Sequence, residues 1–249
     1  MSDALVDVVD LHKAFDTKEV LRGLSFALDK GETLVVMGGS GSGKTVLLRH
    51  IAGLIRPDAG QVRVFGIAIE ALSEEELLPI RRRMGYVFQA AALFDSLSVY
   101  ENVAYPLREH TNLGEDEIRR RVLHFLSLVG LAEDVLNLLP AELSGGMRKR
   151  VGIARALVGE PEMLLFDEPT AGLDPTNSRL VADLIHELHE GVCDTAIVVT
   201  HDVELAKTVA DRLAILIDGR FVTTGARDEV LATSDPVVQA FLAGEAPRR

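Results

Sequence analysis

Residues 33–45, TLVVMGGSGSGKT, restrict the fold of this chain more than any other stretch of its sequence. The apolar run with which the stretch opens is typical of a strand buried on both faces of a parallel sheet. Gly38 follows the run, four residues come next, and the triplet GKT at 43–45 then begins a predicted helix. A strand, a glycine-rich loop and a helix in this order make a phosphate-binding loop. The sequence therefore predicts an α/β fold with a nucleotide at this loop.

The chemistry of such a loop assigns a role to each residue type. Glycines let the backbone curl so that its N–H groups point at a phosphate, and the helix N-terminus adds positive charge. We expect Lys44 to bridge the β- and γ-phosphates of ATP, and the Thr45 hydroxyl to bind Mg²⁺. The alternative is a glycine-rich turn without a ligand, but all three fixed positions of the pattern are present. The residues expected to bind ATP here are Gly38, Gly39, Ser40, Gly41, Ser42, Gly43, Lys44 and Thr45.

Two acidic residues end another apolar segment, MLLFDE at 163–168. Ligands of open α/β sheets bind at the carboxyl ends of the strands, so we expect Asp167 to hold the metal, directly or through water. Glu168 is placed to polarise an attacking water as a general base. Taken alone, such a pair is more often a helix cap or a solvated turn. The catalytic interpretation depends on the phosphate-binding loop elsewhere in the chain.

Strands alternate with helices along most of the chain, which predicts a mainly parallel sheet with crossover helices. Residues 5–28 differ, because their short apolar alternation predicts an N-terminal antiparallel β region. The stretch from about 90 to 160 is rich in helix without a good strand, which predicts an inserted helical subdomain. We therefore expect a single domain over residues 1–249, with a nucleotide-binding core made of 1–89 and 161–249.

Local signals predict individual elements. Ser73, followed three residues later by Glu76, predicts a capping box at the start of a helix. Asp218-Gly219 predicts the turn of a hairpin. In the helix predicted between the strands at 163–167 and 196–200, one apolar face is expected to contain Leu180, Leu184, Ile185 and Leu188.

Composition and charge exclude several classes of protein. The formal net charge of −12 disfavours a nucleic acid as the main partner, because phosphate contacts need a basic face. No run approaches 18 apolar residues, and MSDALVDVVD lacks the basic and apolar regions of a signal peptide. Cys193 is the only cysteine, which excludes an internal disulfide and fits a reducing compartment. We expect a soluble, cytoplasmic chain that another subunit must hold at any membrane it serves.

Seven short motifs occur in an order that resembles the ATPase subunit of an ATP-binding-cassette (ABC) transporter. They are Phe15, GGSGSGKT, YVFQ, LSGGM, LLFDEP, AGLD and VVTHD, and the resemblance extends from about residue 5 to 235. It implies the P-loop ABC ATPase fold. By themselves Gln89 and His201 are ambiguous. The resemblance implies that Gln89 contacts the metal and the attacking water, and that His201 contacts the γ-phosphate. It also implies that Phe15 stacks on adenine, with a core phenylalanine as the alternative.

The motif ELSGGM precedes a helix predicted over residues 145–158 and capped by Ser144. The N-terminus of a helix favours anions, but the spacing does not say whose phosphate it binds. The resemblance implies that two copies pair head to tail, with Asp174 at the seam. Met147 and Ala171 stand where many members of the family have glutamine and serine. The residues implied to bind the other copy's ATP are Ser144, Gly145 and Gly146.

The segment after Gln89 indicates which partner the chain serves. In ABC transporters a membrane permease inserts a short helix beside this glutamine. Here the segment, AAALFDSLSVYENVAYPLREHTNLGEDEI, resembles the ATPase of bacterial Mla/Mce phospholipid-trafficking systems. That resemblance implies movement of phospholipids between the inner and outer membranes, by a chain at the cytoplasmic face of the bacterial inner membrane. The implied partners are a second copy, an integral membrane permease, an MCE-domain lipid-binding protein and a STAS-domain accessory subunit.

Two other classes remain open. An ABC importer for amino acids or another small solute has the same chemistry and a different permease. A soluble ABC protein of translation or DNA maintenance is the weaker alternative, because such proteins usually join two cassettes or insert long coiled coils. Part of the segment after Gln89 also has a structural alternative to partner contact. In that alternative, four of its residues merely pack the helical lobe: Leu93, Phe94, Val99 and Val103.

Overall fold

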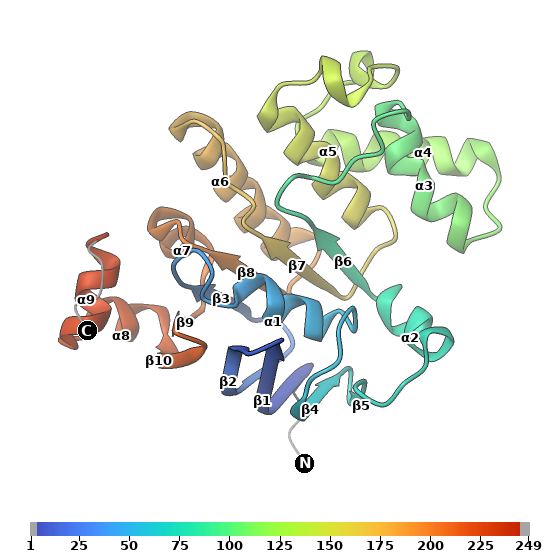
Figure 1. Cartoon of the computed structure of the whole chain (residues 1–249). Coiled ribbons are helices and arrows are strands. Elements are labelled where there is room, and N and C mark those ends of the chain that lie inside the picture. The colour runs from blue at the N-terminus through green and yellow to red at the C-terminus, as the bar shows by residue number, and fades with distance from the viewer. Residues whose placement is uncertain (1–3, 245–249) are drawn as a thin grey trace.

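The computed structural model describes residues 4–244, which form two β-sheets with helices around them (Figure 1). The smaller sheet is antiparallel, with the strand order β2-β1-β4-β5. Its strands are β1 (Val6–Phe15), β2 (Lys18–Leu28), β4 (Ala59–Val64) and β5 (Ile67–Ala68). The larger sheet has the order β10-β9-β3-β8-β7-β6 and is parallel except for β10 at its edge. Its strands are β3 (Thr33–Met37), β6 (Met84–Val87), β7 (Met163–Asp167), β8 (Ala196–Thr200), β9 (Arg212–Ile217) and β10 (Arg220–Ala226).

The helices fall into groups that Figure 1 separates by colour. Helix α1 lies between the two sheets, and α3, α4 and α5 (green to yellow) gather on the side of β6 and β7. The helices are α1 (Lys44–Ile51), α2 (Glu74–Arg81), α3 (Val99–His110), α4 (Glu115–Leu128), α5 (Gly145–Leu157), α6 (Pro175–Gly191), α7 (Val203–Val209), α8 (Arg227–Leu231) and α9 (Pro236–Leu242). Short 3₁₀ turns at Glu133–Val135 and Pro140–Glu142 precede α5. Within residues 4–244 no helix is both long enough and apolar enough to cross a bilayer.

Strand β3 shows how the larger sheet is buried on both faces. Leu34 and Val36 belong to a core shared with α1 and the antiparallel sheet. Val35 and Met37 belong to a second core, shared with α3, α4 and α5. Successive side chains of a strand point to opposite faces, so a strand between two layers needs a continuous apolar run. The predicted mainly parallel sheet and the N-terminal antiparallel region are both confirmed.

The middle of the chain is helical, as its sequence predicts. The structure places no strand between residues 88 and 162, where α3, α4 and α5 lie. The division of the chain into a core of 1–89 and 161–249 and a helical subdomain stays a prediction.

Local signals are confirmed in two cases and wrong in a third. The Ser73 hydroxyl accepts a hydrogen bond from the backbone N–H of Glu76 at 3.3 Å, as a capping box requires. The turn between β9 and β10 has left-handed backbone at both Asp218 and Gly219. Leu180, expected on the buried face of α6, is 53% exposed. The buried set begins at Val181 and has the spacing i, i+3, i+4 and i+7, so Leu180 lies about 100° around the helix from it.

The strand order decides where a site can form. Strands β3, β6, β7 and β8 are parallel, so their carboxyl ends meet at one edge of the sheet. The glycine-rich loop follows β3 at this edge, and Gln89, Glu168 and His201 follow the other three strands. The fold thus brings together four segments that are far apart in the sequence.

Candidate functional site

The glycine-rich loop between β3 and α1 is shaped by close packing. Gly43 is the N-cap of α1 and has a φ of 108°, a conformation that favours glycine. A Cβ on this residue would lie 2.7 Å from Leu21 Cδ2. At the other end of the loop, a Cβ on Gly38 would lie 2.5 Å from the carbonyl oxygen of Leu216. Two of the glycines in the pattern are therefore required by their neighbours.

A cavity of about 430 Å³ opens beside this loop. Its volume is typical of a site for a small molecule. Loop residues 39–46 form one wall, and the other lining residues are Val20, Gln89, Glu168 and His201. Of the eight residues predicted to bind ATP in the loop at 38–45, the structure places all but Gly38 in this lining.

Lys44 is a buried cation in the wall of the cavity. Its Nζ donates hydrogen bonds to the carbonyl oxygens of Gly38 at 2.7 Å and Gly39 at 3.1 Å. It also forms an ion pair of 3.1 Å with Glu168 Oε1. The ammonium group is thus held at the loop by three oxygen atoms, where a phosphate would meet it.

Asp167 lies at the end of β7 and faces the start of α1. The Thr45 hydroxyl donates a hydrogen bond to Asp167 Oδ1 at 2.8 Å, and the Tyr86 hydroxyl donates one to Oδ2 at 3.4 Å. Burial raises the pKa of Asp167, and these two hydrogen bonds oppose the shift. Burial also raises the pKa of Tyr86, so its hydroxyl remains a donor. The adjacent oxygens of Thr45 and Asp167 are ligands of the kind that Mg²⁺ prefers.

The Glu168 carboxylate is held on two sides. His201 Nδ1 lies 2.8 Å from Glu168 Oε2, and the backbone N–H of His201 donates to the same oxygen at 3.3 Å. Lys44 contacts the other oxygen. Glu168 itself has a φ of 49°, in the left-handed region that non-glycine residues seldom adopt. Such strain at a buried carboxylate is typical of functional positions.

Gln89 follows β6 and is exposed at the edge of the cavity. Its carbonyl oxygen accepts a hydrogen bond from Lys149 Nζ, which anchors the backbone of the loop to α5. The structure therefore places Gln89 beside the same cavity as Lys44, Glu168 and His201, as its predicted role requires.

Phe15 lies at the end of β1 and is 45% exposed, which rules out a core phenylalanine. Lys13 Nζ lies 5.5 Å from the centre of its ring. Phe15 is not among the residues that line the 430 Å³ cavity. Stacking on adenine stays a prediction.

The LSGG motif lies apart from this cavity. Ser144 is the N-cap of α5, and its hydroxyl accepts a hydrogen bond from the backbone N–H of Met147 at 3.2 Å. Gly146 packs closely on α6, since a Cβ there would lie 2.6 Å from Asn177 Oδ1. Asp174 caps α6 by accepting hydrogen bonds from two backbone N–H groups at 3.0 Å. Within one chain, Ser144, Gly145 and Gly146 do not line the phosphate cavity.

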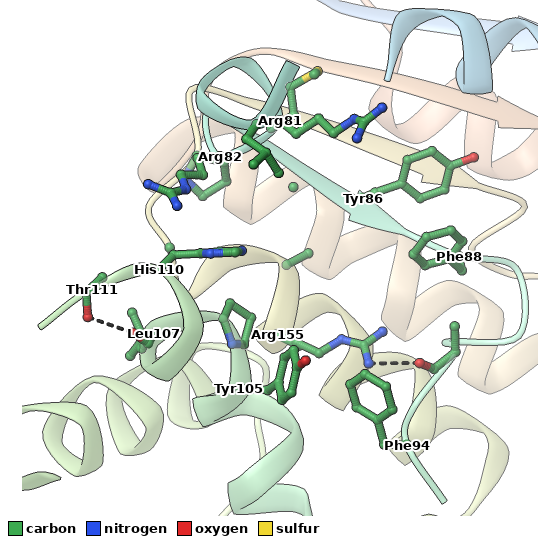
Figure 2. Close-up of a pocket in the computed structure, with 18 residues that line it drawn as sticks. Arg81, Arg82, Tyr86, Phe88, Phe94, Tyr105, Leu107, His110, Thr111 and Arg155 are labelled. Carbon is green, nitrogen blue, oxygen red and sulfur yellow. Dashed lines mark hydrogen bonds between the residues drawn. The ribbon is translucent and has the colours of Figure 1, made fainter. Parts of the chain in front are cut away.

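A larger cavity of about 620 Å³ lies where α2, β6, α3 and α5 meet (Figure 2). Aromatic side chains form much of its wall, and the rings of Phe94 and Tyr105 lie 4.9 Å apart. Arg82 and Arg155 are among its basic lining residues, and no Asp or Glu of the described chain lines it. We call this cavity the groove. In a chain of net charge −12, its basic character marks a distinct surface.

The segment after Gln89 divides between core and groove. Val99 and Val103 are fully buried, and Leu93 packs partly against them. Phe94 is exposed and lines the groove. The structural alternative is therefore right for Leu93, Val99 and Val103 and wrong for Phe94.

Comparison with known proteins identifies the family. A family model described as ABC transporter matches residues 21–171. The chain belongs to the ABC transporter family.

Relatives of this ABC protein include transport ATPases. The chain is 40% identical to the intermembrane phospholipid transport system ATP-binding protein MlaF of Haemophilus influenzae, over 98% of this chain and 92% of MlaF. It is 41% identical to the probable ribonucleotide transport ATP-binding protein mkl of Mycobacterium leprae, over 96% of this chain and 69% of that protein. A dimeric, post-hydrolysis structure of the ATP-binding cassette MJ0796, bound to ADP and Pi, matches with a TM-score of 0.83 and 34% identity. That match covers 89% of this chain and 98% of MJ0796.

The ABC family membership establishes the chain as an ATPase coupled to transport. Its site has the parts that phosphoryl transfer to water needs, which are positioned charge and a proton acceptor. Lys44 and the N-terminus of α1 offer positive charge to phosphates. The Glu168 carboxylate offers an oxygen that could accept a proton, and His201 restricts its orientation.

Sequence reasoning missed one residue of this ABC site. Lys149 is only 5% exposed and donates hydrogen bonds to the carbonyl oxygens of Gln89 and Glu168. In the sequence it lies within MRKR at 147–150, which indicates a solvated basic run. The signal that could have found it is helical spacing, because Lys149 falls on the same buried face as Gly152, Ile153 and Leu157.

Proposed function

We propose that this chain is the ATP-hydrolysing subunit of a bacterial ABC transporter that moves phospholipids between the inner and outer membranes, and that it works at the cytoplasmic face of the inner membrane. The observation that carries the proposal is the groove. It is formed in large part by the segment after Gln89, whose sequence resembles the Mla/Mce ATPases. The name of the MlaF relative, an intermembrane phospholipid transport system ATP-binding protein, supports the same assignment.

In this proposal, the cavity beside the glycine-rich loop holds ATP and Mg²⁺. Lys44 contacts the β- and γ-phosphates, and His201 contacts the γ-phosphate. Mg²⁺, which neutralises phosphate charge when bound, is held by Thr45, Gln89 and Asp167. The 2.8 Å hydrogen bond between the Thr45 hydroxyl and Asp167 supports this, because it brings two oxygen ligands together. Glu168 accepts a proton from the attacking water, and Phe15 stacks on adenine.

The proposal includes a head-to-tail pair of copies. Ser144, Gly145 and Gly146 contact the γ-phosphate that the other copy holds, and Asp174 lies at the seam. The absence of these three glycine and serine residues from the lining of their own chain's phosphate cavity supports this arrangement. So does the dimeric state of the MJ0796 relative.

The groove is the proposed docking site for a short helix of the membrane permease. Exposed aromatic rings at Phe88, Phe94 and Tyr105 suit the apolar face of such a helix. The basic lining at Arg82 and Arg155 favours an acidic residue on the permease. An MCE-domain lipid-binding protein and a STAS-domain subunit complete the proposed assembly.

The experiment is affinity purification of the tagged chain from detergent-solubilised native membranes, followed by mass spectrometry. A permease recovered with an MCE-domain protein is the expected result. The second candidate is a transporter of small solutes, favoured by the ribonucleotide transport name of the mycobacterial relative. Recovery of a permease with a solute-binding protein would establish that candidate instead. An active ATPase without any membrane protein would overturn both.

A variant in the groove tests the docking site directly. Tyr105→Asp places a charge among the aromatic rings and should remove the permease from the purified complex. Val222→Asp on β10 is the matched control, because Val222 and Tyr105 are both 41% exposed and Val222 is not in the groove. Equal recovery of the permease with both variants would refute docking at the groove.

A further inference from the structure

Lys149, on helix α5, is buried between two catalytic segments. Its Nζ donates hydrogen bonds to the carbonyl oxygen of Gln89 and, at 3.2 Å, to that of Glu168. Within residues 4–244, Lys149 forms no ion pair with a carboxylate, so two backbone oxygens compensate the buried charge. A buried ammonium group that lost these acceptors would be strongly destabilised, so the contacts are expected to persist.

Helix α5 also holds the rest of the loop that follows Gln89. Arg155, two turns beyond Lys149, donates hydrogen bonds to the carbonyl oxygens of Ala91 at 2.7 Å and Ala92 at 2.8 Å. Between them, Gly152 allows the loop to approach closely, because a Cβ there would lie 3.2 Å from that of Ala91. The loop is therefore attached to α5 along two turns of helix.

Only Lys149 extends this attachment to the end of β7. Neither Gly152 nor Arg155 contacts Glu168, whereas Lys149 binds its carbonyl oxygen. Glu168 is in the left-handed region, so its backbone needs support from its surroundings. The Lys149 side chain thus joins three pieces of the site, which are the glutamine loop, the base and the helix that begins at Ser144.

We propose that Lys149 is a positioning residue for hydrolysis, which fixes the backbones of Gln89 and Glu168 relative to α5. This inference rests on the proposed role of Glu168 as the general base. When the LSGG end of α5 closes on the other copy's nucleotide, the movement of the helix is passed to the backbones of Gln89 and Glu168 through the Lys149 side chain. Lys149 does not line the phosphate cavity, so its effect falls on the rate of hydrolysis rather than on the binding of ATP.

The first test is steady-state hydrolysis by the full chain. Lys149→Met keeps the length of the side chain and removes its donors. We expect kcat to fall about ten- to a hundredfold with the KM for ATP unchanged, and Lys149→Arg to recover most of the loss. Arg150→Met is the matched control, because Arg150 also lies on α5 and donates to two carbonyl oxygens, those of Val129 and Gly130. A purely structural role would lower kcat equally in both variants.

The second test separates this inference from the role of Glu168. In a Glu168→Gln background, single-turnover rates with labelled ATP should not fall further when Lys149→Met is added, because the two residues act as a unit. If Glu168→Gln alone hydrolyses ATP normally, the general-base assignment fails. If Glu168→Gln is inactive while folded Lys149→Met keeps the original kcat, the positioning role of Lys149 fails alone. Should Lys149→Met not fold, Lys149→Gln replaces it, and an unchanged kcat again overturns the inference.

Discussion

Glu168 Oε1 lies 3.1 Å from Lys44 Nζ, so the proposed general base and the proposed phosphate-binding cation form a buried ion pair. The other carboxylate oxygen lies 2.8 Å from His201 Nδ1. In the proposed function a triphosphate in this cavity also contacts Lys44, and it would therefore compete with Glu168 for the same ammonium group. Binding of ATP and release of the carboxylate toward water are linked by this one contact.

Replacement of Glu168 by glutamine should separate binding from hydrolysis. Glu168→Gln removes the proton acceptor and the competing charge but keeps the size of the side chain. We expect kcat to fall about 10²–10⁴-fold, and ATP to bind at least as tightly as before. Glu162→Gln, on an exposed glutamate at the other end of β7, is the control. Turnover near that of the control would remove Glu168 from the role of base.

Replacement of Lys44 by alanine should have the opposite effect, because it should weaken the binding of ATP. Lys44→Ala removes a charge-assisted donor to the phosphates, so we expect the Kd for ATP to rise about 10–100-fold. An equilibrium titration with a fluorescent ATP analogue measures the change, with exposed Lys207→Ala as the control. An unchanged Kd would show that the phosphates lie elsewhere.

The fold and the phosphate site could be predicted from the sequence because their signals are local. The apolar run before Gly38 and the GKT triplet are each only a few residues long and can be recognised without the rest of the chain. The apolar run is strand β3 in the structure. Asp167 and Glu168 end a strand whose burial is equally plain in the sequence. In a parallel sheet the carboxyl ends of these strands meet at one edge, so no further signal in the sequence is needed to bring their residues together.

What could not be predicted depends on contacts between distant segments. Lys149 finds its acceptors 60 and 19 residues away. Its charge does not distinguish it from exposed Arg148 or half-buried Arg150, and only its helical spacing from buried Ile153 sets it apart. The exposure of Leu180 has a different cause, because a one-residue shift of an apolar face is within the tolerance of a helical pattern.

Asp167 should lower the stability of the nucleotide-free subunit. Burial raises its pKa, so the folded state binds the proton more tightly than the unfolded state, and ionisation removes stability as the pH rises. Asp167→Asn stays neutral and should raise the free energy of unfolding near pH 7. The difference should vanish as the pH falls below the usual range of a carboxyl group. Denaturant unfolding at several pH values measures this, with exposed Asp95→Asn as the control. A less stable Asp167→Asn at neutral pH would contradict the prediction.

Two impaired variants should restore activity when they are mixed and assayed at an ATP concentration too low to saturate the Lys44→Ala chain. Ser144→Ala removes a contact to the other copy's γ-phosphate, and Lys44→Ala removes one within its own cavity. If sites are shared between copies, a mixed dimer has one site with both residues intact and one with neither. Random pairing at equal concentrations should then give about a quarter of the unmodified activity.

The comparison needs evidence that mixed dimers form, which two different affinity tags used in succession provide. The Ser144→Ala chain also loses the cap of α5, at a cost of about 1 kcal/mol, so its folding is checked by thermal unfolding. A mixed dimer as inactive as either variant would place Ser144 and Lys44 in the same site. Recovered activity would show instead that each site takes its LSGG motif from the other copy, which agrees with the absence of Ser144 from the lining of its own chain's phosphate cavity.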